Sequence, residues 1–233
     1  MGIPRDLTVR LLWALDELLP PVLRDSPRVM ALPMRLALGR HAAEFERFKA
    51  AAPDLDAEGY AAVYARLRGA FVDRPTDLNR RCLAAIEAHV VGPRVLDVGS
   101  GSGYLVERLA RRHRVVGCDL YVDPALGARR GARSYCQANA EELPFRDRRF
   151  DTVVCAHTLE HVQNLARTVA ELRRVAARRL IVVVPRQRPY RWTFDLHLHF
   201  FPYPHSLRLA IGRADGPSSC RVVGGDLFYV EER

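Results

Sequence analysis

A glycine-rich turn beside an acid is the part of this sequence best suited to bind a ligand. The stretch "RVLDVGSGSGYLVERLARR" (94–112) begins as a buried strand, turns at alternating glycines and continues as a helix. Glycines let a backbone approach a ligand closely, and the first turn of a helix offers unpaired N–H groups. Asp97 adds a carboxylate inside the apolar run just before the turn. The pattern therefore predicts a ligand at this turn.

The spacing of the glycines excludes one common class of ligand. A nicotinamide or flavin dinucleotide site carries the pattern GxGxxG. Here the glycines are Gly99, Gly101 and Gly103, and Tyr104 stands where that pattern needs its last glycine. The turn is GxGxG, with Asp97 two residues before the first glycine, so the dinucleotide fingerprint fails.

Alternating strands and helices must position this turn. Strand-like runs are predicted near 94–98, 114–119, 134–137, 150–155 and 179–184, with helical patterns between most of them. The clearest helical pattern is "NLARTVAELRRVAARR" (164–179), and Thr76 is expected to cap a helix that runs to Val90. Gly224-Gly225 between two short apolar runs predicts a β-hairpin. The predicted fold is a Rossmann-like, doubly wound α/β fold, with a mostly parallel seven-stranded sheet and an antiparallel hairpin last in the chain.

The bulk composition is that of an ordinary soluble globular protein. The chain has 233 residues, of which 48% are hydrophobic and 27% charged, and no apolar run approaches the roughly 18 residues of a membrane span. The five cysteines show no CxxC spacing, which favours reduced core residues and a cytoplasmic location. The net charge of +9 is almost entirely arginine and is diffuse along the chain, which favours a solvated surface over a nucleic-acid site.

Four segments, in this order, resemble the class I S-adenosylmethionine-dependent methyltransferases, particularly the broad small-molecule group. They are "VLDVGSGSG", "VVGCDL", "CQANAEELPF" and "RRFDTVVCAHTLEHV", and the resemblance covers roughly residues 80–233. It implies S-adenosyl-L-methionine as the cofactor and S-adenosyl-L-homocysteine as its product. The residues that it implies for cofactor binding are Asp97, Gly99, Ser100, Gly101, Gly103, Asp119, Leu120, Asn139, Ala140, Glu141 and His157.

The resemblance also implies roles for three of these polar side chains. Asp97 would order the glycine loop and its contacts to the cofactor's amino group. Asp119, at the end of the second strand, would accept hydrogen bonds from the ribose hydroxyls. Asn139 stands where the family usually has Asp, and its amide oxygen can still accept a bond from the adenine amino group. We therefore expect a modestly altered cofactor affinity.

Methyl transfer from a sulfonium needs alignment and often a base, because the leaving group is already activated. Four histidines are the predicted catalytic residues: His157, His161, His197 and His199. The resemblance places His157 directly after the fourth strand, facing the reaction zone. His161 lies in "LEHV", which recurs in this group whatever the substrate and so favours a structural role.

The aromatic segment "PYRWTFDLHLHFFPYP" (189–204) holds the other two histidines. Related enzymes often carry a histidine before a phenylalanine here, so one of the pair is expected to line the acceptor site. Alternation would place His197 and His199 on one face, but no third acid stands at a matching spacing, and no metal is predicted. The alternative is an apolar seam packed under the N-terminal helices.

The predicted activity is methylation of a small-molecule acceptor, at oxygen rather than nitrogen or carbon, in natural-product, lipid or sugar tailoring. A nucleic-acid methyltransferase is the alternative enzyme. It is disfavoured because "CAHT" replaces the Asn/Asp-Pro-Pro-aromatic motif and no catalytic Pro-Cys dipeptide occurs. A non-catalytic cofactor-binding module is the other alternative, because a fold does not prove an activity. No membrane partner is predicted.

Residues 1–75 contain helical patterns only and differ in texture from the domain predicted over 76–233. Leucines recur from Leu7 to Leu18, a second helical stretch runs to Pro53, and a third is "DAEGYAAVYARLRGAF" (56–71). Their apolar positions need a partner: Trp13, Met30, Met34, Phe45 and Phe48. With little core of their own, these helices are expected to form a cap over the acceptor site. Pairing of two subunits into a homodimer is the alternative.

Overall fold

The computed structural model describes residues 14–15, 18–67, 75–127 and 132–233. The chain divides into two compact units. Unit 1 comprises Met1–Asp77 and Arg188–Leu198, and unit 2 comprises Leu78–Gln187 and His199–Arg233. Residues 188–198 of the aromatic segment therefore belong to the same unit as the N-terminal helices. Residues 78–187, which form most of unit 2, lie between them in the sequence.

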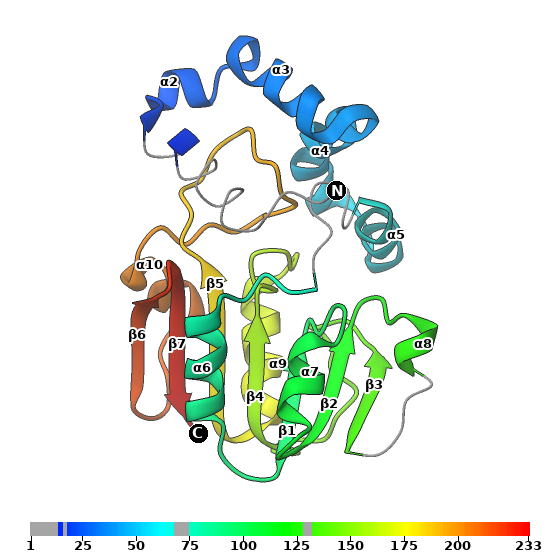
Figure 1. Cartoon of the computed structure of the whole chain (residues 1–233), viewed down its shortest axis with the longest axis vertical. Helices are drawn as coiled ribbons and strands as arrows, with labels where there is room; N and C mark the ends of the chain where they lie inside the picture. Colours follow the sequence, from blue (N-terminus) through cyan, green and yellow to red (C-terminus); the bar gives the residue numbers. More distant parts are fainter. Residues whose placement is uncertain (1–13, 16–17, 68–74, 128–131) are drawn as a thin grey trace. The chain divides into compact units, whose positions relative to one another are not determined.

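Unit 2 is built on one seven-stranded sheet, as predicted (Figure 1). Its strands are β1 (Arg94–Val98), β2 (Arg114–Asp119), β3 (Arg133–Gln137), β4 (Phe150–Ala156), β5 (Ala176–Pro185), β6 (Ser218–Val223) and β7 (Asp226–Glu232). Their order in the sheet is β3-β2-β1-β4-β5-β7-β6. The first five are parallel, and β7 runs antiparallel to both β5 and β6. The carboxyl ends of the parallel strands thus share one edge with the beginning of β7.

Helices cover both faces of this sheet (Figure 1). One face packs against α6 (Arg80–His89) and α7 (Tyr104–Leu109), and the other against α9 (Leu165–Val175) and α10 (Pro204–Ile211). A short α8 (Pro124–Gly127) follows β2. Alternation along β1 puts Val95 on the α6 face and Leu96 on the α9 face. Asp97 therefore points to the same face as α6 and α7.

Two predicted boundaries in unit 2 were wrong. The cap of α6 is Asn79 rather than Thr76, and its side chain accepts a hydrogen bond from the Cys82 amide at 2.9 Å. The helix predicted to run to residue 179 ends at Val175, and β5 begins at once. Ala176 pairs with Phe150 of β4 there, so tertiary pairing overrides the helical propensity of the Ala-Arg run.

Unit 1 is helical in its described residues. Its elements are α2 (Pro21–Arg24), α3 (Pro27–Leu38), η1 (Gly39–His41), α4 (Ala42–Ala51), η2 (Ala52–Asp54) and α5 (Ala57–Leu67). The predicted second helix is broken at Gly39, whose φ of +54° ends α3. Most of the first predicted helix, with Trp13, lies outside the described residues, as does the end of the third.

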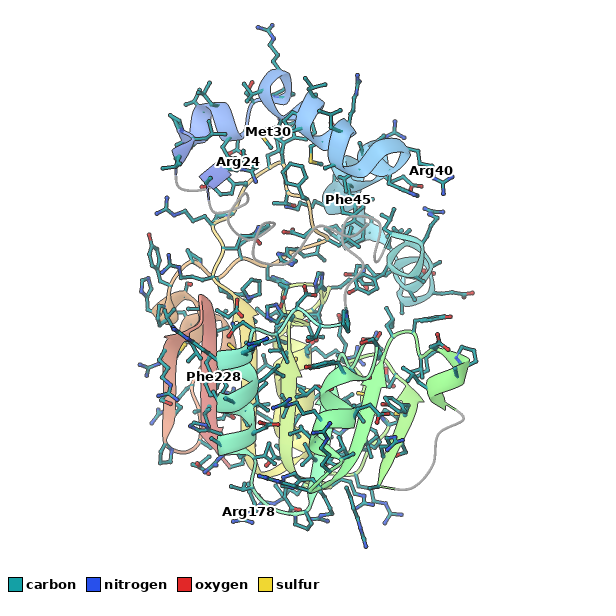
Figure 2. The ribbon with its side chains drawn as sticks, in the orientation of Figure 1. Arg24, Met30, Arg40, Phe45, Arg178 and Phe228 are labelled. Carbon is teal, nitrogen blue, oxygen red and sulfur yellow. The ribbon has the colours of Figure 1, made fainter. Side chains whose placement is uncertain are left out.

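The segment 188–198 packs against these helices inside unit 1. The Arg24 side chain is fully buried; its guanidinium carbon lies 4.6 Å from the centroid of the Tyr190 ring, and it donates to the carbonyl of Trp192. The Trp192 indole donates to the Asp25 carbonyl at 3.1 Å, and the Lys49 ammonium donates to the Tyr190 carbonyl at 3.2 Å. Figure 2 labels Arg24 and Met30, both buried, and the exposed Arg40. The segment is thus anchored by buried polar contacts as well as by its aromatic rings.

No helix in the described ranges combines the length and the apolar character that a membrane span requires.

Candidate cofactor site and the turn after β4

The glycine turn is held on the end of the neighbouring strand by its backbone. The amides of Gly99 and Ser100 donate to the Cys118 carbonyl at 2.8 and 3.0 Å. The next amide, of Gly101, donates to the Asp119 carboxylate at 2.8 Å. These bonds hold the glycine turn, which follows β1, against the end of β2. They therefore bring Asp97 of β1 and Asp119 of β2, the two predicted acids, to the same part of the sheet.

The three glycines meet different surroundings, although all have positive φ (+77°, +51° and +79°). A Cβ on Gly99 would lie 1.9 Å from the Thr158 hydroxyl, and a Cβ on Gly103 would lie 2.5 Å from the Tyr135 hydroxyl. No described atom lies within 4 Å of a Cβ placed on Gly101. The outer glycines are therefore needed for close packing, and the middle glycine borders open space.

Asp97 is a buried acid with an altered charge state. Only 2% of its surface is exposed, and burial, aided by the nearby Asp119 carboxylate, raises its pKa to about 7. The free protein therefore holds Asp97 protonated about half the time at pH 7. A cation bound beside it would favour the ionised form.

Asp119 is half-buried and already shapes the loop around it. One carboxylate oxygen accepts from Gly101, and the other accepts from the Tyr121 amide at 3.2 Å. Each carboxylate oxygen has a second acceptor site, so the side chain can still take hydrogen bonds from a diol. Leu120, next in the chain, is half-buried.

The segment after β3 joins the site through the backbone, because the Ala138 amide donates to the Asp119 carbonyl at 2.9 Å. The Asn139 side-chain oxygen accepts from the Glu141 amide at 2.9 Å, which closes a local turn around Ala140. The Glu141 carboxylate accepts from the Asn164 amide at 2.8 Å, at the start of α9. Glu141 thus has a structural contact that the sequence did not predict.

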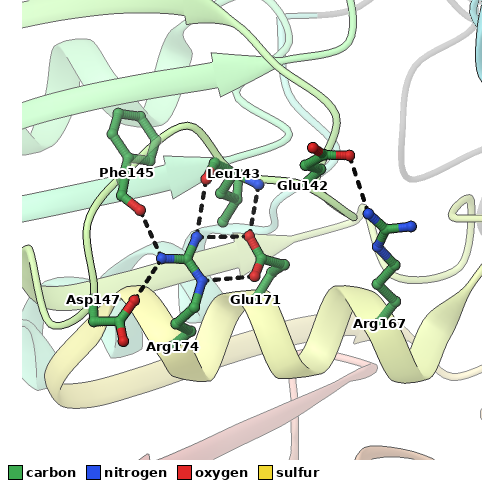
Figure 3. Close-up of polar contacts among 7 residues, drawn as sticks. All are labelled: Glu142, Leu143, Phe145, Asp147, Arg167, Glu171 and Arg174. Atoms are coloured by element: carbon green, nitrogen blue, oxygen red, sulfur yellow. Dashed lines mark hydrogen bonds and ion pairs between the residues drawn. The ribbon is translucent and has the colours of Figure 1, made fainter.

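An arginine on α9 fixes the continuation of this segment (Figure 3). The Arg174 guanidinium donates to the carbonyls of Leu143 and Phe145 at 2.9 and 2.7 Å, and pairs with Glu171 at 2.7 Å. Glu171 in turn accepts from the Leu143 amide at 2.7 Å. Because these are charge-assisted bonds to backbone atoms, they hold the path of the chain just beyond Asn139.

The turn after β4 places His157 between two acids. Its Nδ1 lies 3.5 Å from Glu160, and its Nε2 lies 3.5 Å from Asp226, the first residue of β7. Burial lowers its pKa, but the hydrogen bonds and charges of Asp226 and Glu160 outweigh burial and raise the pKa to about 10. His157 also has a φ of +52°, a left-handed conformation uncommon for residues other than glycine.

The other predicted histidines lie in different settings. His161 is on the same turn, where its amide donates to the Thr158 carbonyl at 2.9 Å. His199 belongs to unit 2, and its Nε2 lies 2.8 Å from the Val162 carbonyl. His197 belongs to unit 1, with its Nδ1 3.3 Å from Asp195. The segment has no strand, so the predicted alternation of His197 and His199 on one face does not apply.

Sequence reasoning missed two acids of this site. Glu160 precedes His161 in "LEHV", but only the histidine was considered as a site residue. The Glu160 side chain is fully buried. Asp226 follows the Gly224-Gly225 turn and had no motif to mark it. Antiparallel pairing of Asp226 with Pro185 of β5 carries it to the carboxyl edge of the sheet, which only the strand order reveals.

These residues fit the group that the sequence resemblance implies. Asp97 and Asp119 provide acceptors for an ammonium group and for ribose hydroxyls, and the open space beside Gly101 gives access to the backbone between them. The buried Ser100 hydroxyl, which has no hydrogen-bond partner among the residues that the structure describes, lies within the same turn. These acceptors and the accessible backbone therefore suit a zwitterionic cofactor that carries a ribose.

Comparison with known proteins shows similarity to methyltransferases. Residues 96–183 match a family described as a methyltransferase domain. A malonyl-[acyl-carrier protein] O-methyltransferase of Geobacter sulfurreducens is 39% identical over 142 residues, which are 56% of this chain and 47% of that protein. A ubiquinone biosynthesis O-methyltransferase of Hahella chejuensis is 42% identical over 97 residues, 38% of this chain and 41% of that protein. The chain spans less than half the length of these curated relatives.

The fold agreement extends beyond the sequence match. A SAM-dependent methyltransferase from Aquifex aeolicus superposes with a TM-score of 0.52 at 17% identity, covering 76% of this chain and 98% of that one. A likeness at this identity bears on the fold alone. The match to a methyltransferase domain over residues 96–183 and this likeness of fold agree with the resemblance that the ordered motifs indicate.

Proposed function

We propose that this protein transfers a methyl group from S-adenosyl-L-methionine to an oxygen atom of a small-molecule acceptor in a biosynthetic pathway. The observation that carries the proposal is the glycine turn, open at Gly101 and flanked by Asp97 and Asp119. The cofactor, when bound, supplies an electrophilic methyl group on a sulfonium. The protein's tasks are then to orient the reactants and to handle a proton.

The turn residues would bind and orient the cofactor. Asp119 would accept from the ribose hydroxyls, while ionised Asp97 would face the amino group. The Asn139 amide would meet the adenine, held in place by the α9 contacts of Arg174. None of these tasks requires a metal ligand.

The acceptor's proton is proposed to leave through a histidine of the carboxyl edge or of unit 1. His199 already uses Nε2 on a backbone carbonyl, and His157 lies between two acids. His161 also has contacts of its own, and His197 pairs with Asp195, so substitution of each of the four histidines by Gln, with the methylation rate against pH as the readout, identifies the base. A base within hydrogen-bond reach of an acceptor hydroxyl would raise its nucleophilicity as the methyl group is transferred.

Preference for oxygen and for a small acceptor is supported by the relatives, whose names describe O-methyltransferases of malonyl-[acyl-carrier protein] and of ubiquinone biosynthesis. It is also supported by "CAHT" in place of a nucleobase-methyltransferase motif. The identity of the acceptor is left to experiment.

Unit 1 is proposed to serve the acceptor. The chain leaves unit 2 directly after β5, on the sheet edge that also carries the glycine turn, and adds 188–198 to the N-terminal helices. If those helices instead pair two subunits, sedimentation of the full chain will report a dimer at micromolar concentration.

Titration calorimetry with S-adenosylmethionine tests the cofactor. We expect binding by the full chain, and Asp119→Ala should lose about 1.5–3 kcal/mol, or roughly 10- to 150-fold in affinity, if both ribose bonds are charge-assisted. Asp123→Ala is the matched control, because Asp123 is an exposed acid nearby that caps the turn into α8. Absence of binding by the folded protein would contradict the proposal. An unchanged affinity in Asp119→Ala would show that the ribose does not bind at Asp119.

A labelled-methyl assay tests the acceptor class. The full chain and labelled cofactor are incubated with the small-molecule fraction, the RNA and the protein of a cell extract, separately. We expect label in the small-molecule fraction as an alkali-sensitive ester or a stable ether. Label mainly in RNA or on protein side chains would overturn the preference, whereas label on an acyl group released from a carrier protein by alkali would not.

A further inference from the structure

We propose that His157 is a positioning residue whose doubly protonated ring joins Glu160 to Asp226, and so fixes the turn after β4 against the beginning of β7. This inference rests on the proposed function only in naming the reaction that the turn serves. It assigns roles to two acids, Glu160 and Asp226, that the sequence alone left without one.

The first argument is that both ring nitrogens face carboxylates. Nδ1 lies 3.5 Å from a Glu160 oxygen and Nε2 lies 3.5 Å from an Asp226 oxygen. A neutral imidazole has one N–H and one lone pair, so one nitrogen would direct a lone pair at a carboxylate. With both acids ionised, only the imidazolium offers a proton to each of them. The geometry therefore favours the charged ring.

The second argument is that the acid on β7 is itself fixed by donors. The oxygen of Asp226 that faces His157 also accepts from the Asn79 amide at 2.7 Å and faces the Cys82 thiol at 3.7 Å. Two donors on one oxygen, the Asn79 side-chain amide and the Cys82 thiol, suit an ionised carboxylate better than a carboxylic acid. Asn79 is also the cap of α6, so the ion cluster ties the turn to the start of that helix as well as to β7.

The third argument connects the cluster to the cofactor turn. His157 holds its left-handed backbone conformation while its amide donates to the Val183 carbonyl at 2.8 Å, on β5. The next residue, Thr158, packs its hydroxyl where a Cβ on Gly99 would lie, and that hydroxyl is 3.2 Å from the Val98 carbonyl. A change in the His157 turn therefore moves a direct neighbour of the glycine turn.

A protonated ring also fits the charges around it. The acids that face it are Glu160 on its own turn and Asp226 on β7, and the Cys82 thiol of α6 lies beside Asp226. The imidazolium leaves the three-residue cluster with one net negative charge. Loss of the ring proton would leave two buried carboxylates facing each other across a neutral ring, which is costly in a low-dielectric interior.

Nitrogen NMR of the full chain labelled with ¹⁵N-histidine tests the protonation state without cofactor or acceptor. The His157 signals are assigned by their loss in His157→Gln. We expect both ring nitrogens to carry protons from pH 6 to pH 9, with no titration in that range. An unprotonated nitrogen on His157 at pH 7.5 overturns the proposal.

Single variants of the acids test the partners. In Glu160→Gln and in Asp226→Asn, the His157 pKa should fall by about one to three units, so that the ring begins to titrate below pH 9. Asp151→Asn is the control, because Asp151 is a similarly buried acid paired with Arg94 at the opposite end of β1. If one variant fails to fold, the other still decides. The assignment is contradicted if the His157 pKa is unchanged in both variants, or if Asp151→Asn lowers that pKa by the same amount.

Cofactor affinity then tests positioning. The ratio of the variant's Kd for S-adenosylmethionine to that of the unchanged protein should rise from pH 6 to pH 9 as the variant's His157 loses its proton. A ratio that stays constant while the NMR shows titration would mean that the cluster is structural only. Failure of all binding would instead contradict the proposed function, while the NMR result would still report on His157.

Discussion

Binding of S-adenosylmethionine should release a proton from Asp97. The buried acid has a pKa of about 7 in the free protein, and a cationic amino group beside it would hold it ionised in the complex. At pH 7 about half of the free molecules carry the proton, so about 0.5 proton should leave per cofactor bound. The release should rise to about 0.9 at pH 6 and fall to about 0.1 at pH 8.

Calorimetry in pairs of buffers measures this release directly. The binding enthalpy at one pH is measured in phosphate and in Tris and plotted against the ionisation enthalpy of each buffer. The slope of this plot is the number of protons exchanged per cofactor bound. We expect the slope for Asp97→Asn to differ from that of the unchanged protein by the protons that Asp97 releases, about 0.9 at pH 6 and about 0.1 at pH 8. Equal enthalpies in both buffers at pH 6.5, with binding intact, would refute the assignment of Asp97 as the linked group.

The same acid predicts how stability depends on pH. Because the folded state raises the pKa of Asp97, it holds the proton more tightly than the unfolded chain does. The associated stability is complete below pH 3.8 and is lost as pH rises towards 7. At pH 8 the buried charge then costs up to about 4 kcal/mol, from about three pKa units at 1.36 kcal/mol each. Asp97→Asn should therefore raise the melting temperature of the free protein at pH 8 and leave it unchanged at pH 3.5.

Two further predictions concern the turn and the N-terminal helices. Gly99→Ala should destabilise the fold by several kcal/mol through its clash with the turn after β4. Gly101→Ala and the control Gly212→Ala, both beside open space, should cost about 1–3 kcal/mol in backbone strain. Of the two milder variants only Gly101→Ala should weaken cofactor binding, and calorimetry alongside urea unfolding separates the two effects. Deletion of 1–77 should yield an aggregation-prone protein, because it uncovers the apolar side chains around Trp192. A monomeric remainder that methylates its acceptor at the full rate would disprove both this prediction and the role proposed for unit 1.

The sheet and the glycine turn could be read from the sequence because local patterns encode them. Apolar runs marked β1, β2 and β4, and the Gly224-Gly225 turn marked the hairpin. The end of α9 could not be read, because pairing with β4, a distant contact, decides it.

The site residues that lie within one motif could be predicted from the sequence. The contacts between residues of different strands could not. Asp97 and Asp119 lie beside their motif, so their spacing identified them. The contact between His157 and Asp226 depends on β7 lying beside β5, and no residue pattern reports that neighbour. Similarly, segment 188–198 looked like one piece with the residues that follow it until the structure divided them between two units.

The division of unit 1 between two stretches of sequence has a consequence for synthesis on the ribosome. The N-terminal helices leave the exit tunnel first, yet Tyr190 and Trp192, which Arg24 and Asp25 contact, are added only after all of 78–187. During that interval the nascent helices expose apolar side chains, and the five parallel strands are complete only at its end. Strands β6 and β7 follow 188–198 in the chain, so both units are completed late in translation. The N-terminal helices are therefore expected to fold only after 188–198 has been made, and to need chaperone protection until then.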